Sequence, residues 1–317
     1  MLKFGIYKPS QLLDKSKFYG LFGDKKHFSI SLYGDMPCLV DRDEISQEIL
    51  MQFSDARGIY KRTYSKRFED FDKHCLEVIR EKLPQGKTIV HDVGVSDART
   101  SCDFYEKLCF FFADCEFYAS DYNPDVIILY RGTTILVISE SLEILETTIP
   151  PFVWNQSRIR KEKFLYPLNF LLKWLAENMV SKKMIYEYRK GKIPMKKTLS
   201  LFCQRAKDLC SKSPHFHLLK HNILDKSPIS DGLSVLRAMN VLNPSFFSIE
   251  ELQLAIECFL SSLVDGGLFI TGCNQASDSM VNGAIYQKKK FCFVPVSSSG
   301  QGSAINNIII SSRQKLS

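Results

Sequence analysis

The chain has 317 residues, 45% of them hydrophobic, and a formal net charge of +7 at pH 7. This length accommodates one large or two smaller domains, and the apolar content is ample for a packed core. The charge tolerates an acidic partner without requiring one, because solubility alone accounts for it. No stretch of about 18 uncharged apolar residues occurs, which argues against a membrane-spanning helix.

Residues 1–85 are polar and carry apolar side chains at helical spacing over 44–53 and 68–83. Apolar residues three and four positions apart mark the buried face of an amphipathic helix. Pro84 and Gly86 then interrupt the chain before its first strongly apolar run. We therefore expect an N-terminal helical cap over 1–85, followed by a second domain.

That second domain, expected over 86–317, opens with a strand over 88–95. A helix over 100–112 and a strand over 116–120 follow, and the second strand ends at Asp121. Strands that alternate with helices are typical of a parallel sheet covered by helices.

The loop after the first strand has the composition of a ligand-binding turn. The apolar run of this strand ends in Asp92, and Gly94 lacks a Cβ atom, so a ligand can approach its backbone closely. In open α/β sheets, ligands bind at the carboxyl ends of the strands, where this loop lies. It is not the dinucleotide pattern G-x-G-x-x-G, because Ser96 and Arg99 replace the second and third glycines.

The alternation of strands and helices is interrupted by an insertion at about 126–213. Its pattern predicts a β-hairpin over 126–138, a further extended piece over 141–153, an apolar helix over 164–180 and a basic helix over 196–212. Together with the N-terminal helices, we expect this insertion to form a cap over an acceptor site. The aromatic residues of the insertion favour a small or partly apolar acceptor; they are Phe152, Trp154, Tyr166 and Trp174.

The alternation then resumes to the end of the chain. The predicted elements are strands over 216–224, 233–240 and 268–272, a helix over 249–263, and β segments over 283–296 and 305–311. Gly266 and Gly267 are typical of a glycine C-cap after the helix. The whole pattern predicts an α/β, Rossmann-like fold: a seven-stranded, mainly parallel sheet with a C-terminal antiparallel β-hairpin.

Polar residues follow four successive predicted strands of this sheet. They are the loop residues at Asp92–Asp97, then Asp121, Asn222 and Asn240. Neighbouring strands would bring these ends to one crevice, where a carboxylate after the second strand can accept hydrogen bonds from both hydroxyls of a ribose. The sequence therefore predicts a nucleoside-binding site.

Three segments carry a resemblance to a known family. These are 91–97 (HDVGVSD), 118–121 (YASD) and 263–270 (LVDGGLFI), followed by the closing β-hairpin. On them the chain resembles class I S-adenosylmethionine-dependent methyltransferases. The short segments 221–224 and 239–242 resemble those of chemotaxis-receptor glutamate methyltransferases within that superfamily.

The resemblance implies S-adenosylmethionine as cofactor and S-adenosylhomocysteine as product. Gly94 and Ser96 would lie beside the methionine part, in a loop completed by Asp97, and Asp92 would orient the amino group. Asp121 would hold the ribose.

The same resemblance assigns the adenine and methyl ends of the cofactor. Tyr122 would lie against the adenine, which Asn222 and Ile223 would flank. Asn240 and Val241 would line the floor near the methyl group.

Methyl transfer is an in-line attack on a sulfonium, whose leaving group needs no acid, so positioning supplies much of the acceleration. A general base is required only for some acceptors. Tyr122, His221 and Asn240 are the candidates for catalytic contacts near the acceptor. The identity of the acceptor, the atom methylated and the oligomeric state do not follow from the sequence.

Two departures from the family keep alternatives open. Ala98 stands where the loop usually carries a glycine, and a positive φ there would strain an alanine. This motivates a module that binds the cofactor without catalysis, as a scaffold or sensor. The arginine-bearing helical domain of the chemotaxis enzymes is not evident in 1–85, so methylation of receptor carboxylates does not follow.

A nucleic-acid amino-group methyltransferase is a third hypothesis. Residues 243–246 echo the Asn-Pro-Pro-Tyr/Phe element of enzymes that act on adenine, in which Asn243 would bind the amine and Phe246 would stack on the base. Lysine runs such as 288–290 would then contact phosphates. A turn that begins the next helix, and a solvated basic face, explain the same residues.

The remaining sequence signals favour a metal-free cytoplasmic protein. His215, His217 and His221, with Cys203 and Cys210, do not have the compact spacing of a zinc site. The ten cysteines include no C-x-x-C pair, and the N-terminus lacks the apolar core of a signal peptide. Reduced thiols in the cytoplasm are the simplest interpretation.

Overall fold

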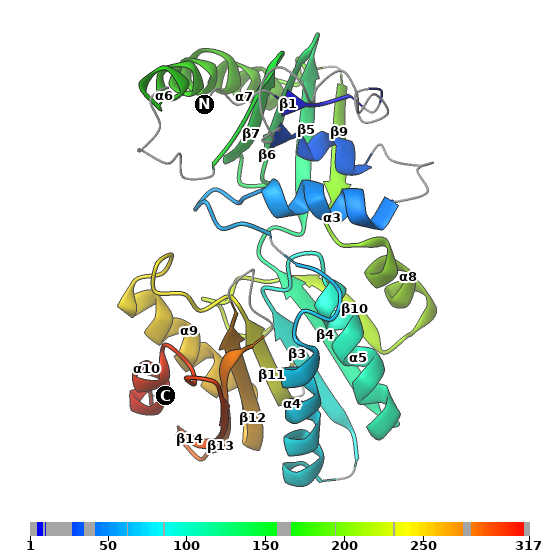
Figure 1. The fold of residues 1–317 in the computed structure, drawn as a ribbon, viewed down its shortest axis with the longest axis vertical. Helices are drawn as coiled ribbons and strands as arrows, with labels where there is room; N and C mark the ends of the chain where they lie inside the picture. Colours follow the sequence, from blue (N-terminus) through cyan, green and yellow to red (C-terminus); the bar gives the residue numbers. More distant parts are fainter. Residues whose placement is uncertain are drawn as a thin grey trace. The chain divides into compact units, whose positions relative to one another are not determined.

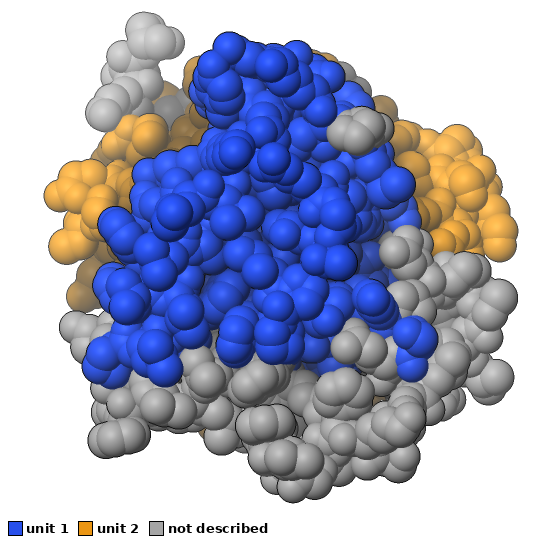
Figure 2. All heavy atoms as spheres, turned by 90° about the horizontal axis from the view of Figure 1, so that it is seen from above, with its two compact units in different colours: residues 1–63, 125–201 blue, residues 64–124, 202–317 orange. Residues whose placement is uncertain are grey.

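The chain forms two compact units, which Figure 1 shows as a ribbon and Figure 2 colours separately. The structure is a computed structural model. Unit 1 comprises residues 1–63 and 125–201, and unit 2 comprises residues 64–124 and 202–317. The residues it describes are 5–8, 10, 27–34, 42–61, 63–84, 86–156, 166–193, 195–230, 232–274 and 280–313.

Unit 2 is built on a seven-stranded sheet with the order β10-β4-β3-β11-β12-β13-β14. The first five strands in this order pair in parallel, and β13 and β14 are antiparallel to their neighbours. This confirms the predicted fold class. The strands are β3 (Thr88–Val93), β4 (Cys115–Asp121), β10 (Phe216–Lys220), β11 (Leu233–Met239), β12 (Leu263–Cys273), β13 (Asn282–Lys289) and β14 (Cys292–Ser299).

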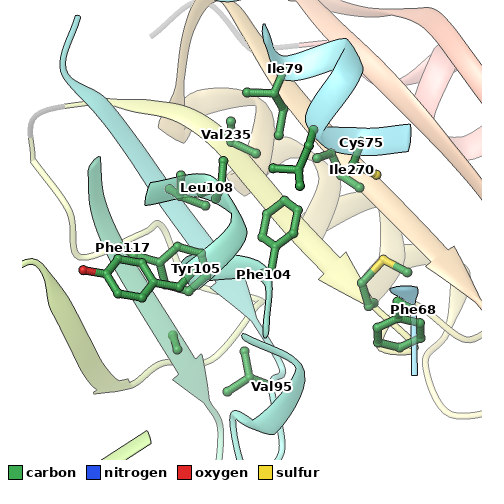
Figure 3. Packing of buried hydrophobic residues seen from close by; sticks show 14 of the residues in the cluster. Phe68, Cys75, Ile79, Val95, Phe104, Tyr105, Leu108, Phe117, Val235 and Ile270 are labelled. Carbon is green, nitrogen blue, oxygen red and sulfur yellow. The ribbon is translucent and has the colours of Figure 1, made fainter. Parts of the chain in front are cut away.

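Helices cover both faces of this sheet. They are α4 (Glu69–Lys82), α5 (Arg99–Phe111), α8 (Gln204–Lys212), α9 (Ile249–Ser262) and α10 (Asn306–Ser311). Alternate residues of the buried strands point to opposite faces, so Leu268 and Ile270 join the core cluster under α4 and α5 while Phe269 joins the one under α9. Figure 3 shows the first cluster, where side chains of α4, α5 and the strands meet.

The sheet changes direction at β3. From β3 the chain moves outward to β4 and β10, and then returns to β11 on the opposite side of β3 and continues to β12. The connections after β3 and β11 therefore leave in opposite directions. Such a switch point opens a crevice at the carboxyl ends of the two strands, which is where open α/β sheets bind ligands.

Unit 1 is built on a five-stranded antiparallel sheet with the order β8-β7-β6-β5-β9. The predicted hairpin is confirmed as β5 and β6. The elements are β1 (Gly5–Ile6), β2 (His27–Phe28), η1 (Ile30–Gly34), α3 (Arg42–Gln52), β5 (Asp125–Arg131), β6 (Thr134–Ile138), β7 (Ile144–Ile149), β8 (Phe152–Asn155), α6 (Tyr166–Leu175), η2 (Ala176–Ser181), α7 (Lys182–Arg189) and β9 (Met195–Ser200).

The division of the chain differs from the expected boundary near residue 85. Residues 1–63 group with the insertion, whereas α4 belongs to unit 2. The reason is packing: Phe71, Cys75 and Ile79 of α4 lie in the core under the sheet of unit 2.

Two local predictions of secondary structure were wrong. The basic helix expected over 196–212 is α8 only from Gln204, because residues before it form β9 and pair with β5. The strand expected over 305–311 is helix α10, and the buried Ile309 of this helix lies four residues after the buried N-cap residue Ile305. Consequently the C-terminal hairpin is β13 and β14.

The glycine C-cap was also wrong, because α9 ends at Ser262 and β12 begins at Leu263 in extended backbone. Gly266, with φ of 83°, lies within β12. It falls where the β11–β12 register shifts between Leu233 and Val235, so the glycine serves an irregular strand.

No helix in the part of the chain that the structure describes is long and apolar enough to cross a membrane. Nine of the ten cysteines lie in this part, and none of the nine is in a disulfide.

Candidate functional site

The loop after β3 is fastened to the end of β4. The backbone N–H of Val95 donates to the carbonyl of Ser120 at 3.1 Å, and that of Ser96 donates to Oδ2 of Asp121 at 2.7 Å. The loop makes its turn with positive φ angles at Gly94, Ser96 and Ala98, of 67°, 62° and 63°. The loop and the acid after the second strand therefore form one structural feature at the switch point.

Asp121 is held in a fixed orientation by backbone donors. Its Oδ2 accepts from Ser96, and its Oδ1 accepts the N–H of Asn123 at 3.1 Å, with 8% of the residue exposed. An ionised carboxylate offers about four acceptor directions, so a group held in this way can also accept a pair of hydroxyls. The adjacent Tyr122 is 46% exposed.

Asp92 lies beneath this surface, in a buried charge cluster. Its Oδ2 accepts from Nη1 of Arg237 at 2.7 Å and from Oγ of Ser101 at 2.7 Å. Nη2 of Arg237 donates to Asp72 at 2.9 Å, and the guanidinium lies over the ring of Phe104. The structure thus places the Asp92 carboxylate against α5 and β11.

The electrostatics of this cluster follow from burial. Burial raises the pKa of Asp92, and it raises the pKa of Asp72 to about 6 despite the neighbouring Arg237. Burial opposes the charge of Arg237, but Asp72 and Asp92 outweigh it and raise the pKa of the guanidinium. Arg237 is therefore the positive charge that compensates the buried carboxylates of Asp72 and Asp92.

Gly94 and Val241 meet across β3 and β11. A Cβ atom on Gly94 would overlap the side chain of Val241, so only glycine fits here. Asn240, with φ of 59°, pairs its side-chain amide with Asn274: its Nδ2 donates to Oδ1 at 3.1 Å, and its Oδ1 accepts the backbone N–H at 3.0 Å. The end of β11 is therefore locked against the end of β12.

The segment after β10 is partly structural. Asn222 accepts the N–H of Leu224 through its own side chain at 3.2 Å, and Ile223 is buried in the core under α9. His221 is buried with its ring centroid 5.2 Å from that of His91, and burial lowers the pKa of His221.

Asp97 is also directed inward. It is fully buried, and its carboxylate accepts the backbone N–H and the Nε of Arg99 at 3.0 and 3.4 Å. Its carbonyl accepts the N–H of Cys203 at 2.9 Å. These contacts fix the start of α5 and the connection to α8.

One polar atom of the loop lacks a protein partner. The hydroxyl of Ser96 is buried and makes no hydrogen bond in the part of unit 2 that the structure describes. A buried, unsatisfied hydroxyl costs on the order of 1–3 kcal/mol, so a ligand atom that bonded to it would gain that amount. This is the observation by which the loop fits a polar ligand such as the methionine part of S-adenosylmethionine.

The structure thus brings together part of the predicted set: Gly94, Ser96, Asp121, Asn240 and Val241 meet at the ends of three neighbouring strands, with Tyr122 beside them. The side chains of Asp92, Asp97 and Ile223 lie inside unit 2. Sequence reasoning missed Asp72, Arg237 and Asn274. Arg237 could have been recognised as a buried charge that needs a partner, because it is the only charged residue in the apolar run of β11.

Two other sequence signals have structural explanations. His215 and His217 both contact the carboxylate of Glu116, at 2.8 and 3.0 Å, and no group of three or more metal-ligating side chains occurs in the part of the chain that the structure describes. Oδ1 of Asn243 accepts the N–H of Ser245 at 2.8 Å, which makes this segment the turn before α9.

Ala98 adopts the positive φ that strains an alanine, with a value of 63°. Replacing it with glycine is expected to change the free energy of unfolding by no more than about 1 kcal/mol. Relief of left-handed strain, about 1–2 kcal/mol, is opposed by loss of a fully buried methyl group, about 0.8, and by glycine's backbone entropy, about 0.5–1. Urea unfolding of both proteins measures the difference, and a gain above 2 kcal/mol would show uncompensated strain.

His91 is expected to make unit 2 sensitive to acid. Its ring nitrogens contact Ser120 and Ser227 at 2.8 and 3.0 Å, and burial, reinforced by His221, lowers its pKa to about 3. Above pH 6.5, His91 is neutral in both the folded and the unfolded protein and does not lower the free energy of unfolding. As the pH falls from 6.5 toward 3, His91 takes up a proton only in the unfolded state, so the free energy of unfolding decreases. Asp72, with its raised pKa of about 6, acts in the opposite direction.

The His91→Gln variant isolates this effect because every other group titrates in both proteins. Between pH 7 and 4.5, wild type should lose roughly 2–3 kcal/mol more unfolding free energy than the variant. Urea denaturation across this range measures both profiles. Parallel profiles would contradict a neutral, buried His91.

Comparisons with known proteins add no family assignment. No family model matches the chain, and no curated protein matches it. Among solved structures it is similar to an N-methyltransferase from Bradyrhizobium japonicum in complex with S-adenosyl-L-homocysteine, with 12% identity over 66% of this chain and 62% of that one and a TM-score of 0.31.

Two further solved structures are similar at the same level. A magnesium protoporphyrin IX methyltransferase from Synechocystis, with bound SAM, shares 11% identity over 71% of this chain and 64% of that one, with a TM-score of 0.30. An S-adenosylmethionine-dependent methyltransferase from Clostridium acetobutylicum shares 12% identity over 75% and 74%, also with a TM-score of 0.30. The chain spans less than two thirds of the first two, and none of the three similarities supports the resemblance to chemotaxis-receptor enzymes.

Proposed function

We propose that unit 2 binds S-adenosylmethionine at the carboxyl ends of β3, β4 and β11 and transfers its methyl group to an acceptor of unknown identity. One observation carries the proposal. The Asp121 carboxylate is oriented by two backbone N–H groups beside the Gly94 loop, at the switch point of the sheet. A fixed carboxylate at this place suits the two hydroxyls of a ribose.

The neighbouring residues would hold the rest of the cofactor. Tyr122, half exposed, would lie against the adenine, and the unpartnered hydroxyl of Ser96 would bond to the methionine part. Asn240 and Val241 would bound the methyl end. Asp92 would act from beneath, because its contacts with Ser101 and Arg237 hold the loop and the start of α5 in place.

The bound cofactor supplies an activated methyl group, whose transfer needs no acid for the leaving sulfur. The protein's contribution is then mainly to hold the acceptor in line with that methyl. Where the acceptor must lose a proton, a neutral imidazole can take it. His221, whose lowered pKa keeps it neutral at pH 7, is our candidate for this role.

A binding module without catalysis is the second candidate, and specific observations favour it. The side-chain amide of Asn240 is committed to Asn274, and the Asp92 carboxylate is committed to Arg237 and Ser101. Two residues expected to contact the cofactor, Asn240 near its methyl group and Asp92 at its amino group, are therefore engaged by the protein itself.

Incubation with methyl-labelled S-adenosylmethionine distinguishes the two candidates. The protein is first tested for cofactor binding by equilibrium dialysis and then mixed with a cell extract that is separated into protein, nucleic acid and small molecules. Transfer of label to protein or small molecules supports the enzyme. Binding without transfer to any fraction supports the module, label in nucleic acid alone supports the third hypothesis, and absence of binding contradicts both proposals.

A further inference from the structure

The helix of unit 1 that runs through α6, η2 and α7 carries a group of exposed apolar side chains on the face that is turned away from the sheet of unit 1. Its exposed side chains are Leu168, Phe170, Leu171, Trp174, Met179 and Tyr186. Phe170 is 53% exposed and Trp174 51% exposed. Single exposed apolar residues are common, but a contiguous group on one helix marks a binding surface.

The opposite face of the same helix packs on the sheet of unit 1. Oδ1 of Asn169 accepts from the indole of Trp154 at 3.1 Å, and the hydroxyl of Ser181 contacts that of Thr147 at 2.8 Å. Met184 is fully buried in a core cluster with residues of β5 and β6. The helix is therefore anchored by one face, and its apolar face is an additional feature.

Residues four positions apart form a row along the helix that leads from its apolar part to a basic part. They are Trp174, Asn178, Lys182, Tyr186 and Lys190. Nδ2 of Asn178 donates to the carbonyl of Trp174 at 2.8 Å, and Nζ of Lys182 donates to Oδ1 of Asn178 at 2.7 Å. Further along, Nζ of Lys190 lies 4.4 Å from the ring centroid of Tyr186. In an α-helix, each step of four residues moves the side chain by about 40° around the helix axis. The π-helical segment η2 turns less per residue, so it moves the side chains back in the opposite direction and the row stays on one side of the helix.

The exposed charges along this segment are all positive. The two acids between residues 166 and 197 are only part-exposed and paired: Glu177 contacts Lys173 at 3.6 Å, and Glu187 contacts Arg131 at 3.2 Å. The exposed cations are Lys182, Lys183, Arg189, Lys190, Lys192 and Lys196. A binding partner of this face must therefore offer an apolar layer beside negative charge.

We propose that this face binds the surface of an anionic membrane. An interfacial helix presents Trp, Phe and Leu to the boundary between head groups and acyl chains, while lysines contact the anionic head groups. The helix would lie in the plane of the membrane, with Leu171 and Trp174 inserted and Lys182 and Lys183 among the head groups. Long lysine side chains can extend toward the head groups while their stems cover apolar surface.

The experiment uses the full-length chain and sonicated vesicles of phosphatidylcholine with 30% phosphatidylserine, compared with phosphatidylcholine alone. Wild type should co-sediment with the anionic vesicles, and the fraction bound should fall at high salt. The Leu171→Ser/Trp174→Ser variant should bind at least about tenfold more weakly, because two exposed apolar side chains no longer insert. Lys182→Glu/Lys183→Glu should lose a similar factor or more.

Phe110→Ser is the matched control, since it removes an exposed aromatic residue from unit 2 and should leave vesicle binding unchanged. Fluorescence gives an independent readout because the chain has only two tryptophans, and Trp154 is buried. Anionic vesicles should shift the emission of Trp174 to shorter wavelength, and the Trp174→Phe variant should lose that shift while it still binds.

Three results would overturn the proposal. They are no co-sedimentation with anionic vesicles, equal binding by wild type and the Leu171→Ser/Trp174→Ser variant, and a wild-type dimer in analytical ultracentrifugation that this variant abolishes. The last result would assign the face to a second copy of the chain.

Discussion

Replacing Arg237 with methionine should lower the free energy of unfolding by about 3–5 kcal/mol, as expected when one partner of a buried ion pair is removed. Asp72 and Asp92 both depend on this guanidinium, through contacts of 2.9 and 2.7 Å. Without it, two buried carboxylates would face each other with no cation. This loss is a large part of the 5–15 kcal/mol by which domains are typically stable.

Urea denaturation of the wild type and the variant measures this loss. Arg237→Met combined with Asp72→Asn and Asp92→Asn is the matched control, and it should recover much of the stability because no charge stays buried unpaired. The penalty of the single variant should also be smaller at pH 5 than at pH 8, since a carboxyl with a raised folded pKa destabilises as the pH rises. A single variant within 1 kcal/mol of wild type at pH 8 would refute the role of Arg237.

Replacing Asp121 with alanine should weaken binding of S-adenosylmethionine by about 100-fold or more. Each hydrogen bond to a charged group contributes about 1.5–3 kcal/mol, and the proposal gives this carboxylate two ribose hydroxyls. The variant also removes the acceptor for the N–H groups of Ser96 and Asn123, so part of the effect would come from the loop. Asp121→Asn, which keeps one oxygen acceptor, should bind with intermediate affinity.

Asp114→Ala is the control for these variants. Asp114 is an exposed acid just before the other end of the same strand, so its loss removes the same charge far from the site. Isothermal titration calorimetry should find its affinity within about twofold of wild type. Equal affinities for wild type and Asp121→Ala would remove Asp121 from the binding site.

Local pattern was enough to predict the core of unit 2. An apolar run, a glycine turn and a helix identify β3, its loop and α5, and an acid after the next run identifies Asp121. The resulting fold is confirmed by the sheet order. The meeting of Asp121 with the loop followed from topology, because neighbouring parallel strands end at the same edge.

The missed features depend on contacts between residues far apart in the chain. Arg237 and Asp72 are 165 residues apart, and nothing in the local sequence of α4 marks Asp72 as a buried partner. The residues of β9 fall in a segment whose local pattern predicts a helix. They form a strand because they pair with β5, which lies far away in the chain. Even the packing of Val241 on Gly94 requires β11 to lie beside β3.

The decisive measurement of cofactor binding is a crystal structure of the protein grown with S-adenosylhomocysteine. We expect the two ribose hydroxyls at hydrogen-bond distance, about 2.6–3.2 Å, from the carboxylate of Asp121, with the amino-acid part of the ligand beside Ser96. A ligand bound away from the ends of β3 and β4 would contradict cofactor binding at this site, as would crystals in which the side chains of Asn240 and Val241 close the site and no ligand enters.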